Sequence, residues 1–486
     1  MNHFAETDLT GRGELRADVV VVGSGPGGAV TACTLAEGGR DVLLIEEGPR
    51  LSLDDTEPFS RDELERKYRN GGFSVALGGP AMAFAEGRCV GGGSEVNSGL
   101  YHRTPPEILE QWRRTFGLRG ASEEELAPHF ETCERDVNVS LLPNPAPPAS
   151  LRLHDGAEAL GWQSLEVPRW SRYADDGTER RQSMTETYLP RALEAGCRLA
   201  SNARAQRVQS SSGKFVVSGV QTSRGGLEHG FEIRAERVVL ASGAIQTPLL
   251  LRRSGIRNHV GRTLHFHPTV KVIARFPDRV NDATMGVPVH QVKEFSPRIG
   301  LGCAISQPPH LALAMLDHPD SMPGVLDEWQ HHASYYAMTR GGVGAVRTLP
   351  LFEDPLVTFR LSNQDFVDLA EGLRHLCQCL WAAGADTLYP SVRGLGPFRD
   401  EADLAKLPSA LPRGATSLMT IHAFSTCPMG EDRTRTATDS FGRVHDVPGL
   451  SVADASLLCS PPSVNPQGSV MAFARRNAMA ILGEIE

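Results

Sequence analysis

The stretch from Ala17 to Gly48 constrains the fold more strongly than any other part of the chain. It reads ADVVVVGSGPGGAVTACTLAEGGRDVLLIEEG, in which an apolar strand leads into a glycine cluster, a helix-forming run and a second apolar strand. This order is typical of the βαβ unit that binds a dinucleotide. The sequence therefore predicts an α/β fold with a Rossmann-like domain built around this unit.

The glycines and the acid of this unit each have a physical role. Gly23 permits the tight turn out of the strand, Gly25 lets the backbone approach a pyrophosphate, and Gly28 lets the helix pack on the strand. The helix N-terminus offers unpaired N–H groups to the phosphates. Glu46 ends the second strand, where its carboxylate can accept hydrogen bonds from ribose hydroxyls and would repel the 2′-phosphate of NADP. The unit alone leaves both FAD and NAD open.

Composition excludes several classes of protein. The chain has 486 residues, a net charge of −9 and no basic run, so we expect no nucleic-acid partner. No stretch approaches the roughly 20 apolar residues of a membrane span, and the polar N-terminus has no signal-peptide core. Nine cysteines without CxxC spacing fit a reducing compartment, so we expect a cytoplasmic protein without disulfides or a metal site.

Other stretches predict further parts of the same domain. The run from Ser210 to Glu236 alternates apolar and polar residues and predicts a β-meander, which leads into a buried strand at 237–244. The stretch 449–456 predicts another strand. The run from Ser469 to Leu482 predicts an amphipathic helix, whose apolar side carries Val470, Phe473, Ala474, Ala478 and Ile481. Pieces of the dinucleotide domain therefore lie at both ends of the chain.

These pieces predict that a second domain interrupts the first. Between about residues 267 and 420, proline-rich breaks separate irregular strands, and we expect this region to face the substrate. The expected ranges are 14–105, 195–266 and 421–486 for the dinucleotide domain, 106–194 for a mixed helical segment on the substrate side, and 267–420 for the substrate domain.

Four blocks occur in a fixed order along the chain. They are the βαβ unit, the loop RCVGGGSEVN at 88–97, the run GAIQTPLLL at 243–251 with SGI at 254–256, and a C-terminal block. The last comprises HAFSTCPMG at 422–430, VADAS at 452–456 and Asn465-Pro466. In this combination the chain resembles the glucose–methanol–choline (GMC) flavoprotein oxidoreductases over nearly its full length.

The resemblance implies FAD as cofactor and an inserted α+β substrate domain built on an antiparallel sheet. It places the ADP half on Gly23, Gly25, Gly28 and Glu46, the flavin along Gly92, Ser94 and Asn97, the adenine on the backbone of Val208, and the ribityl and pyrophosphate region by Asp454 and Ala455. Some relatives carry a histidine, just before the loop asparagine, that bonds covalently to the flavin. Val96 stands there, so we expect non-covalent FAD.

The chain departs from the family pattern at three positions of the C-terminal block. Ala423 and Ser425 replace a proline and a glycine of the usual motif, so the pocket wall is expected to differ in shape. Asn465 stands where some members have a second histidine, a variation known among relatives.

The expected reaction is oxidation of an alcohol, in which flavin N5 takes a hydride and a base takes the hydroxyl proton. His422 is the candidate base. The pKa of an aliphatic alcohol exceeds that of imidazole by roughly ten units, so a second group must hold the developing alkoxide. The Asn465 amide can do this without a change of charge.

Other assignments of function stay open. Some relatives of the same fold are redox-neutral lyases or light-driven decarboxylases, and an NAD-linked dehydrogenase could use the same βαβ unit. Oxygen or another acceptor would reoxidise the flavin. An apolar or aromatic alcohol, such as a secondary-metabolite intermediate, is expected from a presumed pocket of Phe266, Met285, Phe295, Leu311, Met315, Trp329, Tyr335 and Tyr336.

Three further histidines are expected to be structural. His265 and His267 alternate in LHFHP, but no third ligand stands at a spacing that would make a metal site. His102 follows the glycine-rich loop and is expected to be a hydrogen-bonded loop residue.

Overall fold

The two apolar strands of the βαβ unit lie side by side at the centre of a parallel sheet. The computed structural model describes residues 6–9, 15–58, 60–211, 213–223 and 225–485. Strand β1 (Leu15–Val22) pairs in parallel with β2 (Val42–Ile45), and helix α1 (Pro26–Glu37) connects them. Gly23, with φ of 101°, makes the turn between β1 and α1. The predicted Rossmann-like unit is confirmed.

Five parallel strands form the core of this first sheet, in the order β9 (Arg198–Ala200), β2, β1, β12 (Glu228–Leu240) and β23 (Leu450–Val452). The predicted meander is also present. Strands β10 (Ala203–Ser211) and β11 (Lys214–Thr222) form an antiparallel hairpin that pairs with the first part of β12.

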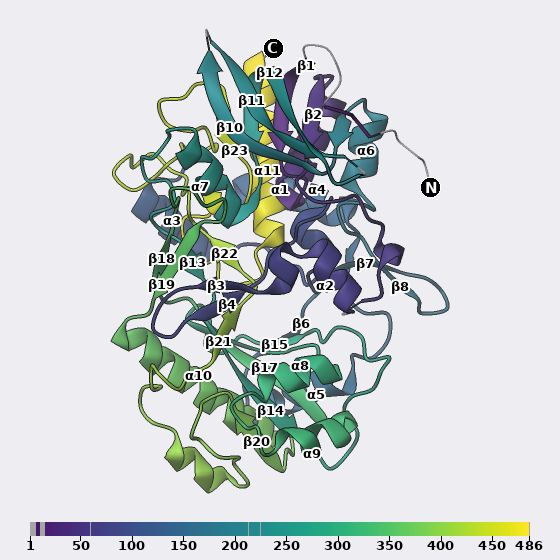
Figure 1. Cartoon of the computed structure of the whole chain (residues 1–486). Coiled ribbons are helices and arrows are strands. Elements are labelled where there is room, and N and C mark those ends of the chain that lie inside the picture. Colours follow the sequence, from purple (N-terminus) through teal and green to yellow (C-terminus); the bar gives the residue numbers. More distant parts are fainter. Residues whose placement is uncertain (1–5, 10–14, 59, 212, 224, 486) are drawn as a thin grey trace.

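Helices cover this sheet. The C-terminal helix α11 (Gln467–Ile485) packs against α1 and α4 (Glu123–Asp136), and Figure 1 shows it in yellow beside α1. Its five predicted core residues are all buried. Helix α4 begins with a capping box between Ser122 and Glu125, and helices α3 (Pro106–Phe116) and α6 (Tyr188–Glu194) add side chains to the same hydrophobic core.

A second, mostly antiparallel sheet of nine strands fills the lower half of the molecule (Figure 1). Its order is β3 (Ser74–Ala76), β4 (Met82–Phe84), β21 (Leu418–Thr420), β14 (Thr269–Arg275), β17 (His332–Thr339), β16 (Ile299–Cys303), β15 (His290–Val292) and β6 (Ser164–Glu166), with β20 (Thr387–Pro390) also on β14. Helices α5 (Pro148–Ala159) and α10 (Asn363–Ala382) pack on it and complete a second core.

Smaller elements complete the two halves. The helices among them are α2 (Arg61–Lys67), α7 (Gly243–Arg253), α8 (Pro308–Ala314) and α9 (Met322–Asp327). The strands are β5 (Val139–Ser140), β7 (Arg169–Tyr173), β8 (Glu179–Arg181), β13 (His265–Phe266), β18 (Val343–Arg347), β19 (Leu356–Arg360) and β22 (Ala423–Phe424).

The two halves interleave along the chain more than the expected linear ranges allow. Strands β3 and β4 fall within 14–105 but belong to the second sheet, because β4 pairs with β21. Within 106–194, α3, α4 and α6 pack on the first core, whereas α5 and β6 pack with the second. Residue 14, where the first range begins, lies outside the described residues.

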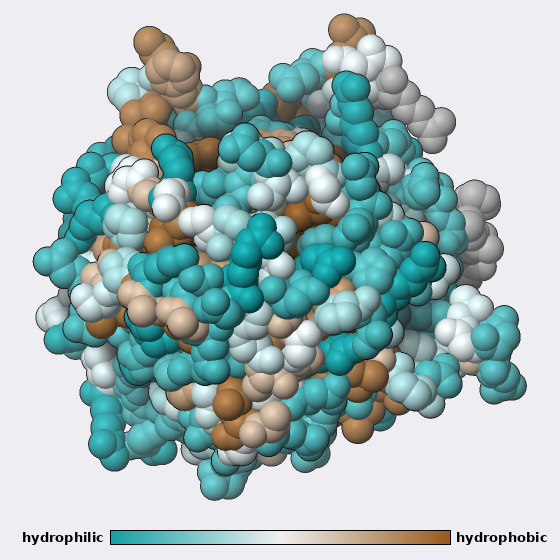
Figure 2. All heavy atoms as spheres, turned by 90° about the horizontal axis from the view of Figure 1, so that it is seen from below, coloured by the Kyte–Doolittle hydropathy of each residue, from teal (hydrophilic) through white to brown (hydrophobic). Residues whose placement is uncertain are grey.

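The end of the molecule below the second sheet has an ordinary polar surface. Figure 2 shows it as mostly hydrophilic, with apolar residues in small separate groups. Among the described residues, no helix combines the length and the apolar character needed to cross a membrane. All nine cysteines are buried and unpaired.

Candidate active site

A cavity of about 620 Å³ opens at the carboxyl ends of the parallel strands. Ligands bind at this edge in open α/β sheets. Nine of the residues singled out from the sequence line it: Gly23, Gly25, Glu46, Gly92, Asn97, His422, Asp454, Ala455 and Asn465. The structure therefore brings the dinucleotide motif and the two candidate catalytic residues to one space.

Backbone forms the wall of the cavity at the start of α1. A Cβ on Gly92 would lie 2.8 Å from the Cα of Gly25, and a Cβ on Gly27 would lie 1.7 Å from the carbonyl oxygen of Ala453. No side chain caps the N-terminus of α1, so its free N–H groups are available to an anion. This cradle fits a pyrophosphate that approaches the backbone closely.

Glu46 is held rigidly beside this cradle. One carboxylate oxygen accepts hydrogen bonds from the Ser24 N–H (2.9 Å) and hydroxyl (2.8 Å), and the other accepts from the Gly48 N–H (3.0 Å). Burial raises the pKa of this carboxyl group. The side chain still lines the cavity, in a position suited to accept hydrogen bonds from a ribose.

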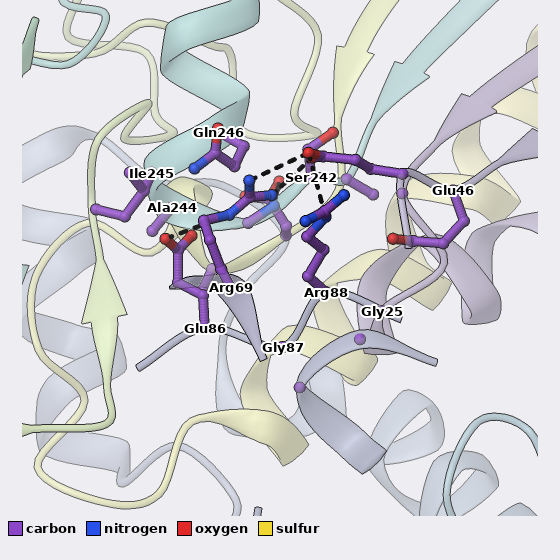
Figure 3. Close-up of a pocket in the computed structure, with 18 of the residues that line it drawn as sticks. Gly25, Glu46, Arg69, Glu86, Gly87, Arg88, Ser242, Ala244, Ile245 and Gln246 are labelled. Atoms are coloured by element: carbon purple, nitrogen blue, oxygen red, sulfur yellow. Dashed lines mark hydrogen bonds and ion pairs between the residues drawn. The ribbon is translucent and has the colours of Figure 1, made fainter. Parts of the chain in front are cut away.

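Charged side chains surround the same end of the cavity. Arg69 donates to both carboxylate oxygens of Glu47 (3.2 and 2.7 Å) and lies 3.7 Å from Glu86. Arg88 lies 3.5 Å from Glu47. Figure 3 shows Arg69 and Glu86 together, across from the first turn of α7 with Ala244, Ile245 and Gln246. Glu86 is thus one of the cavity-lining acids.

Three predicted cofactor residues lie outside the cavity lining. Gly28 instead faces the strand, because a Cβ there would lie 1.8 Å from the Gly23 carbonyl oxygen. This packing role is the one expected for it. Ser94 is fully buried, donates to the Gly91 carbonyl (2.8 Å) and accepts from the Met184 N–H (3.1 Å), so it shapes the loop from behind.

Val208 is the third of these residues. Its side chain is buried, and its N–H donates to the Ser254 hydroxyl at 2.9 Å. The part of β10 that lines the cavity is Ala203–Ala205, and the strand register shifts between Ala205 and Arg207. The backbone available to an adenine is therefore at 203–205 rather than at Val208.

His422 sits where the two sheets meet. Strands β13 and β22 pair Phe266 with Ala423, which brings the LHFHP segment against the C-terminal block. The Nδ1 atom of His422 lies 3.0 Å from Nδ1 of His267. Burial lowers the pKa of His422 to about 4 and that of His267 well below its usual value. Both imidazoles are therefore neutral at physiological pH.

Asn465 is held by the second sheet. Its Oδ1 accepts a hydrogen bond from Gln291 Nε2 at 3.1 Å, and Gln291 Oε1 accepts one from the Lys293 ammonium at 2.7 Å. His102 Nε2 lies 3.1 Å from the same Gln291 oxygen, so His102 is hydrogen-bonded as expected. Because Oδ1 of Asn465 already has a donor, its Nδ2 is the group left for a ligand in the cavity.

Two more predicted residues link these parts. Asn97 Nδ2 donates to Gln467 Oε1 at 2.7 Å, which ties the glycine-rich loop to the start of α11. Asp454 accepts from the Gly243 N–H (2.9 Å) and the Thr247 hydroxyl (2.5 Å) at the start of α7. Burial raises the pKa of Asp454. Both residues thereby fix backbone that lines the cavity.

The structure does not bring the eight residues of the presumed apolar pocket together at the cavity. None of them lines it, although Tyr336 lies 3.4 Å from Gln291. Phe266 and Tyr335 are fully buried in the second core, Leu311 and Met315 lie in a small separate core, and Phe295 stacks on His375 at 3.9 Å. Aromatic and aliphatic residues of a sequence are common in any core, so their presence alone could not identify a pocket.

The sequence reasoning missed the partners of the candidate catalytic residues. His267 was expected to be structural, yet it contacts His422 directly. Gln291 was not singled out, and it lies 174 positions from Asn465, so no spacing pattern could connect them. Across the described part of the chain, no group of three metal-ligating side chains is placed to hold a metal ion.

Comparison with known proteins places the chain among flavoenzymes. Models described as GMC oxidoreductase match residues 64–269 and 350–474, and a model of an NAD(P)-binding Rossmann-like domain matches residues 21–72. An uncharacterized GMC-type oxidoreductase of Sinorhizobium fredii is 38% identical, over 96% of this chain and 95% of the relative.

More distant similarities extend this result. A long-chain-alcohol oxidase of Arabidopsis thaliana is 27% identical, over 95% of this chain and 67% of the relative. The solved structure of a pyridoxine 4-oxidase from Mesorbium loti superimposes with a TM-score of 0.74 at 19% identity, over 96% of this chain and 99% of that one. This last similarity concerns the fold.

Proposed function

This chain belongs to the GMC oxidoreductase family and is an FAD-dependent oxidoreductase, and we propose that it oxidises an alcohol to a carbonyl compound. The proposal depends on one observation: His422 and Asn465 both line the cavity that begins at the dinucleotide cradle. The similarity to a long-chain-alcohol oxidase supports the choice of an alcohol as substrate.

The residues that line the cavity suit FAD. The pyrophosphate would lie at the N-terminus of α1, the ribose at Glu46 and the adenine along 203–205. Gly92, Asn97, Asp454 and Ala455 would line the rest of the cofactor. When bound, FAD supplies the acceptor for the hydride of the alcohol carbon. Val96 offers no nucleophile, so we infer that FAD is held without a covalent bond.

His422 would take the proton of the alcohol. Its Nδ1 faces His267, so Nε2 is the nitrogen left for a substrate hydroxyl. With its pKa lowered to about 4, the imidazole is unprotonated and available, but it is a weak base. An aliphatic alcohol lies about 12 pKa units above it, so complete proton transfer without help would cost roughly 16 kcal/mol.

Asn465 would provide that help. Its Nδ2 can donate a hydrogen bond to the oxygen on which negative charge develops. Because Gln291 holds the amide oxygen at 3.1 Å, the amide is oriented before the substrate arrives. His422 and Asn465 would thus act together, one as base and one as donor to the alkoxide. The acceptor that reoxidises the flavin is proposed to be oxygen or another oxidant.

Anaerobic stopped-flow measurement of flavin reduction tests this function. The His422→Ala variant is expected to stay yellow and to lose the reduction step by at least about a hundredfold, since a general base contributes on the order of 10² to 10⁴ in rate. The exposed His229 provides a matched control, and His229→Ala should behave as the parent enzyme. Equal rates in the parent and His422→Ala would refute the base role.

The same experiment separates the competing reactions. A redox-neutral lyase or decarboxylase would convert its substrate without bleaching the flavin absorbance near roughly 450 nm. A panel of primary, secondary, aryl and long-chain alcohols should bleach it, at rates that rank the substrates. If no alcohol, charged or uncharged, reduces the flavin, alcohol oxidation is refuted.

A further inference from the structure

Two lysines share the face of the second sheet that turns toward Asn465. Gln291 of β15 contacts Asn465 and accepts from Lys293, so both point toward the catalytic end of the cavity. Across the sheet, Gln291 pairs with Gly302, Gly302 with Tyr336, and Tyr336 with Lys271. Directly paired residues project from the same face of a sheet, so Lys271 and Lys293 both lie on this one.

Strand β16, which lies between β15 and β17, carries two glycines on this face. Gly302 lies beneath the ring of Tyr336, since a Cβ there would lie 2.3 Å from the ring. Gly300 has only the end of Met338 near it, at 3.8 Å from the Cβ position. The Tyr336 ring therefore fills the position above Gly302, and Gly300 leaves open space in front of this face. Lys271 and Lys293 are each partly exposed.

Neither lysine has an acidic partner. Among the described residues, Lys67, Lys214 and Lys406 each pair with a carboxylate (Glu63, Glu236 and Asp403, respectively), whereas Lys271 and Lys293 form no ion pair. Burial alone lowers the pKa of both ammonium groups to about 8, so most of each stays charged at neutral pH. An interior charge without a counter-charge is unfavourable, and a bound anion would relieve that cost.

The rest of this face also lacks negative charge. It carries Thr269, Lys271, Gln291, Lys293, Gly300, Gly302, Tyr336 and Met338, none of which is acidic. The carboxylates that line the cavity come from other segments: Glu46, Glu47, Glu86, Glu228, Glu353, Asp354 and Asp454. The surface facing Asn465 from the second sheet is therefore cationic and polar.

We infer that the alcohol oxidised by this enzyme carries an anionic group, a carboxylate or a phosphate, which lies on this sheet face and is attracted by the positive charges of Lys271 and Lys293. The inference rests on the proposed alcohol oxidation and specifies its substrate class. It differs from the expectation of an apolar or aromatic alcohol. The hydroxyl would lie at His422 and Asn465, while the anion would lie against the face of β14 and β15 that begins beside Asn465.

The test compares matched alcohols on the FAD-loaded enzyme. Linear ω-hydroxy carboxylates of graded length are compared with their methyl esters and with amino alcohols of equal length, and alkanediol monophosphates form the phosphate arm. We expect kcat/KM for the best acid or phosphate to exceed that for its neutral counterpart at least tenfold, and amino alcohols to be poorest. The better of the two anionic series identifies the group.

Lysine variants then assign the effect. Lys271→Met, Lys293→Met and the double variant should reduce the ratio of acid to ester activity toward one, whereas Lys214→Met, at a surface ion pair, should leave the ratio unchanged. Binding gives a readout besides turnover. A dicarboxylate has no hydroxyl that could be oxidised, and its binding can be followed by the change in flavin absorbance. It should bind the parent enzyme at least tenfold more tightly than the double variant.

Three outcomes would overturn the inference. They are a preference for neutral or amino alcohols, a ratio that the double variant does not change, and variants that alter only the affinity of the flavin for sulfite, which would mean that the lysines serve the flavin. If no alcohol of any charge reduces the flavin, the proposed oxidation itself fails. The dicarboxylate titration would then still decide whether the anion site exists.

Discussion

The Nδ1 atoms of His267 and His422 lie 3.0 Å apart, and this contact determines which nitrogen of His422 can act as a base. Between two neutral imidazoles in such a contact, one Nδ1 carries the proton and donates the hydrogen bond, and the other Nδ1 accepts it. If His422 donates, its Nε2 carries a free lone pair that can accept the substrate proton. If His267 donates, the proton of His422 is on Nε2 and the base is lost. The base role proposed for His422 therefore requires His267 to act as the acceptor.

Replacement of His267 should slow proton removal without loss of the cofactor. We expect His267→Leu to lower the rate of flavin reduction about 10- to 100-fold, a size typical of groups that orient a functional histidine, with a smaller change in KM. His267→Gln should recover part of the rate, because its amide oxygen can accept the proton from His422 Nδ1. Stopped-flow reduction measures both variants, and equal rates for leucine and glutamine would contradict the acceptor role.

Gln291 should control Asn465 in a comparable way. Its Nε2 donates to Asn465 Oδ1, and its Oε1 accepts from Lys293. In Gln291→Glu, the carboxylate cannot donate, so Asn465 would turn its NH₂ group toward Glu and its oxygen toward the substrate. We expect this variant to lose at least about tenfold in kcat/KM and to be slower than Gln291→Met, although glutamate is closer in shape. A glutamate variant as fast as the parent would refute this orientation.

Sequence pattern was sufficient for the parts of the fold that depend on local signals. The βαβ unit, the meander and α11 follow from glycine spacing and from strand and helix periodicity, and each is present. The second sheet was expected only in outline. Its strands β3, β4 and β21 are three residues long and pair across distant segments, so no local pattern could order them.

The same limit applies to the candidate site. His422 and Asn465 stand in family motifs, and both line the cavity. Their partners His267 and Gln291 come from the second sheet, and their role exists only because tertiary packing brings them close. Val208, in contrast, was predicted from the family resemblance to lie at the cofactor, but it does not line the cavity. The residues of β10 that line the cavity, 203–205, stand three or more positions before it, which sequence alone does not reveal.

Acid should destabilise the folded enzyme through its buried histidines. Burial lowers the pKa of His102 to about 3, whereas an unfolded chain takes up this proton near pH 6.5. Between these values the unfolded state binds the extra proton, so the free energy of unfolding falls as the pH falls, by up to about 1.4 kcal/mol per pH unit for this histidine.

His102→Gln isolates this contribution, since glutamine can also donate to Gln291. Denaturant unfolding with saturating FAD between pH 4 and 7 should give a shallower pH dependence for the variant than for the parent. The difference in slope is expected to approach about 1.4 kcal/mol per pH unit. Parallel curves for the two proteins would show that His102 is not kept neutral by the fold.

The flavin should be released by simple denaturation. Val96 stands where some relatives attach the cofactor through a histidine, and the Val96 side chain can form no such bond. Acid precipitation should therefore leave the yellow colour in the supernatant, where it would be identified as FAD by chromatography. Colour retained in the pellet would mean a covalent link at another residue.

Ser425 stores backbone strain that glycine would relieve. It stands in the C-terminal block where the family motif has glycine, and its φ of 66° is in the left-handed region. The side chain is fully buried, and its hydroxyl has no hydrogen-bond partner among the described residues. A left-handed non-glycine residue costs roughly 1–2 kcal/mol, and a buried unpaired hydroxyl costs about 1 kcal/mol or more.

We therefore expect Ser425→Gly to raise the free energy of unfolding by about 1 kcal/mol, after the greater chain entropy of glycine in the unfolded state is subtracted. Ser425→Ala removes the hydroxyl but keeps the Cβ, so it should give a smaller gain and separate the two costs. Urea unfolding with saturating FAD measures both variants. A glycine variant no more stable than the alanine variant would show that the left-handed backbone at 425 carries no strain, and the departure from the family glycine would then concern only the shape of the wall beside His422.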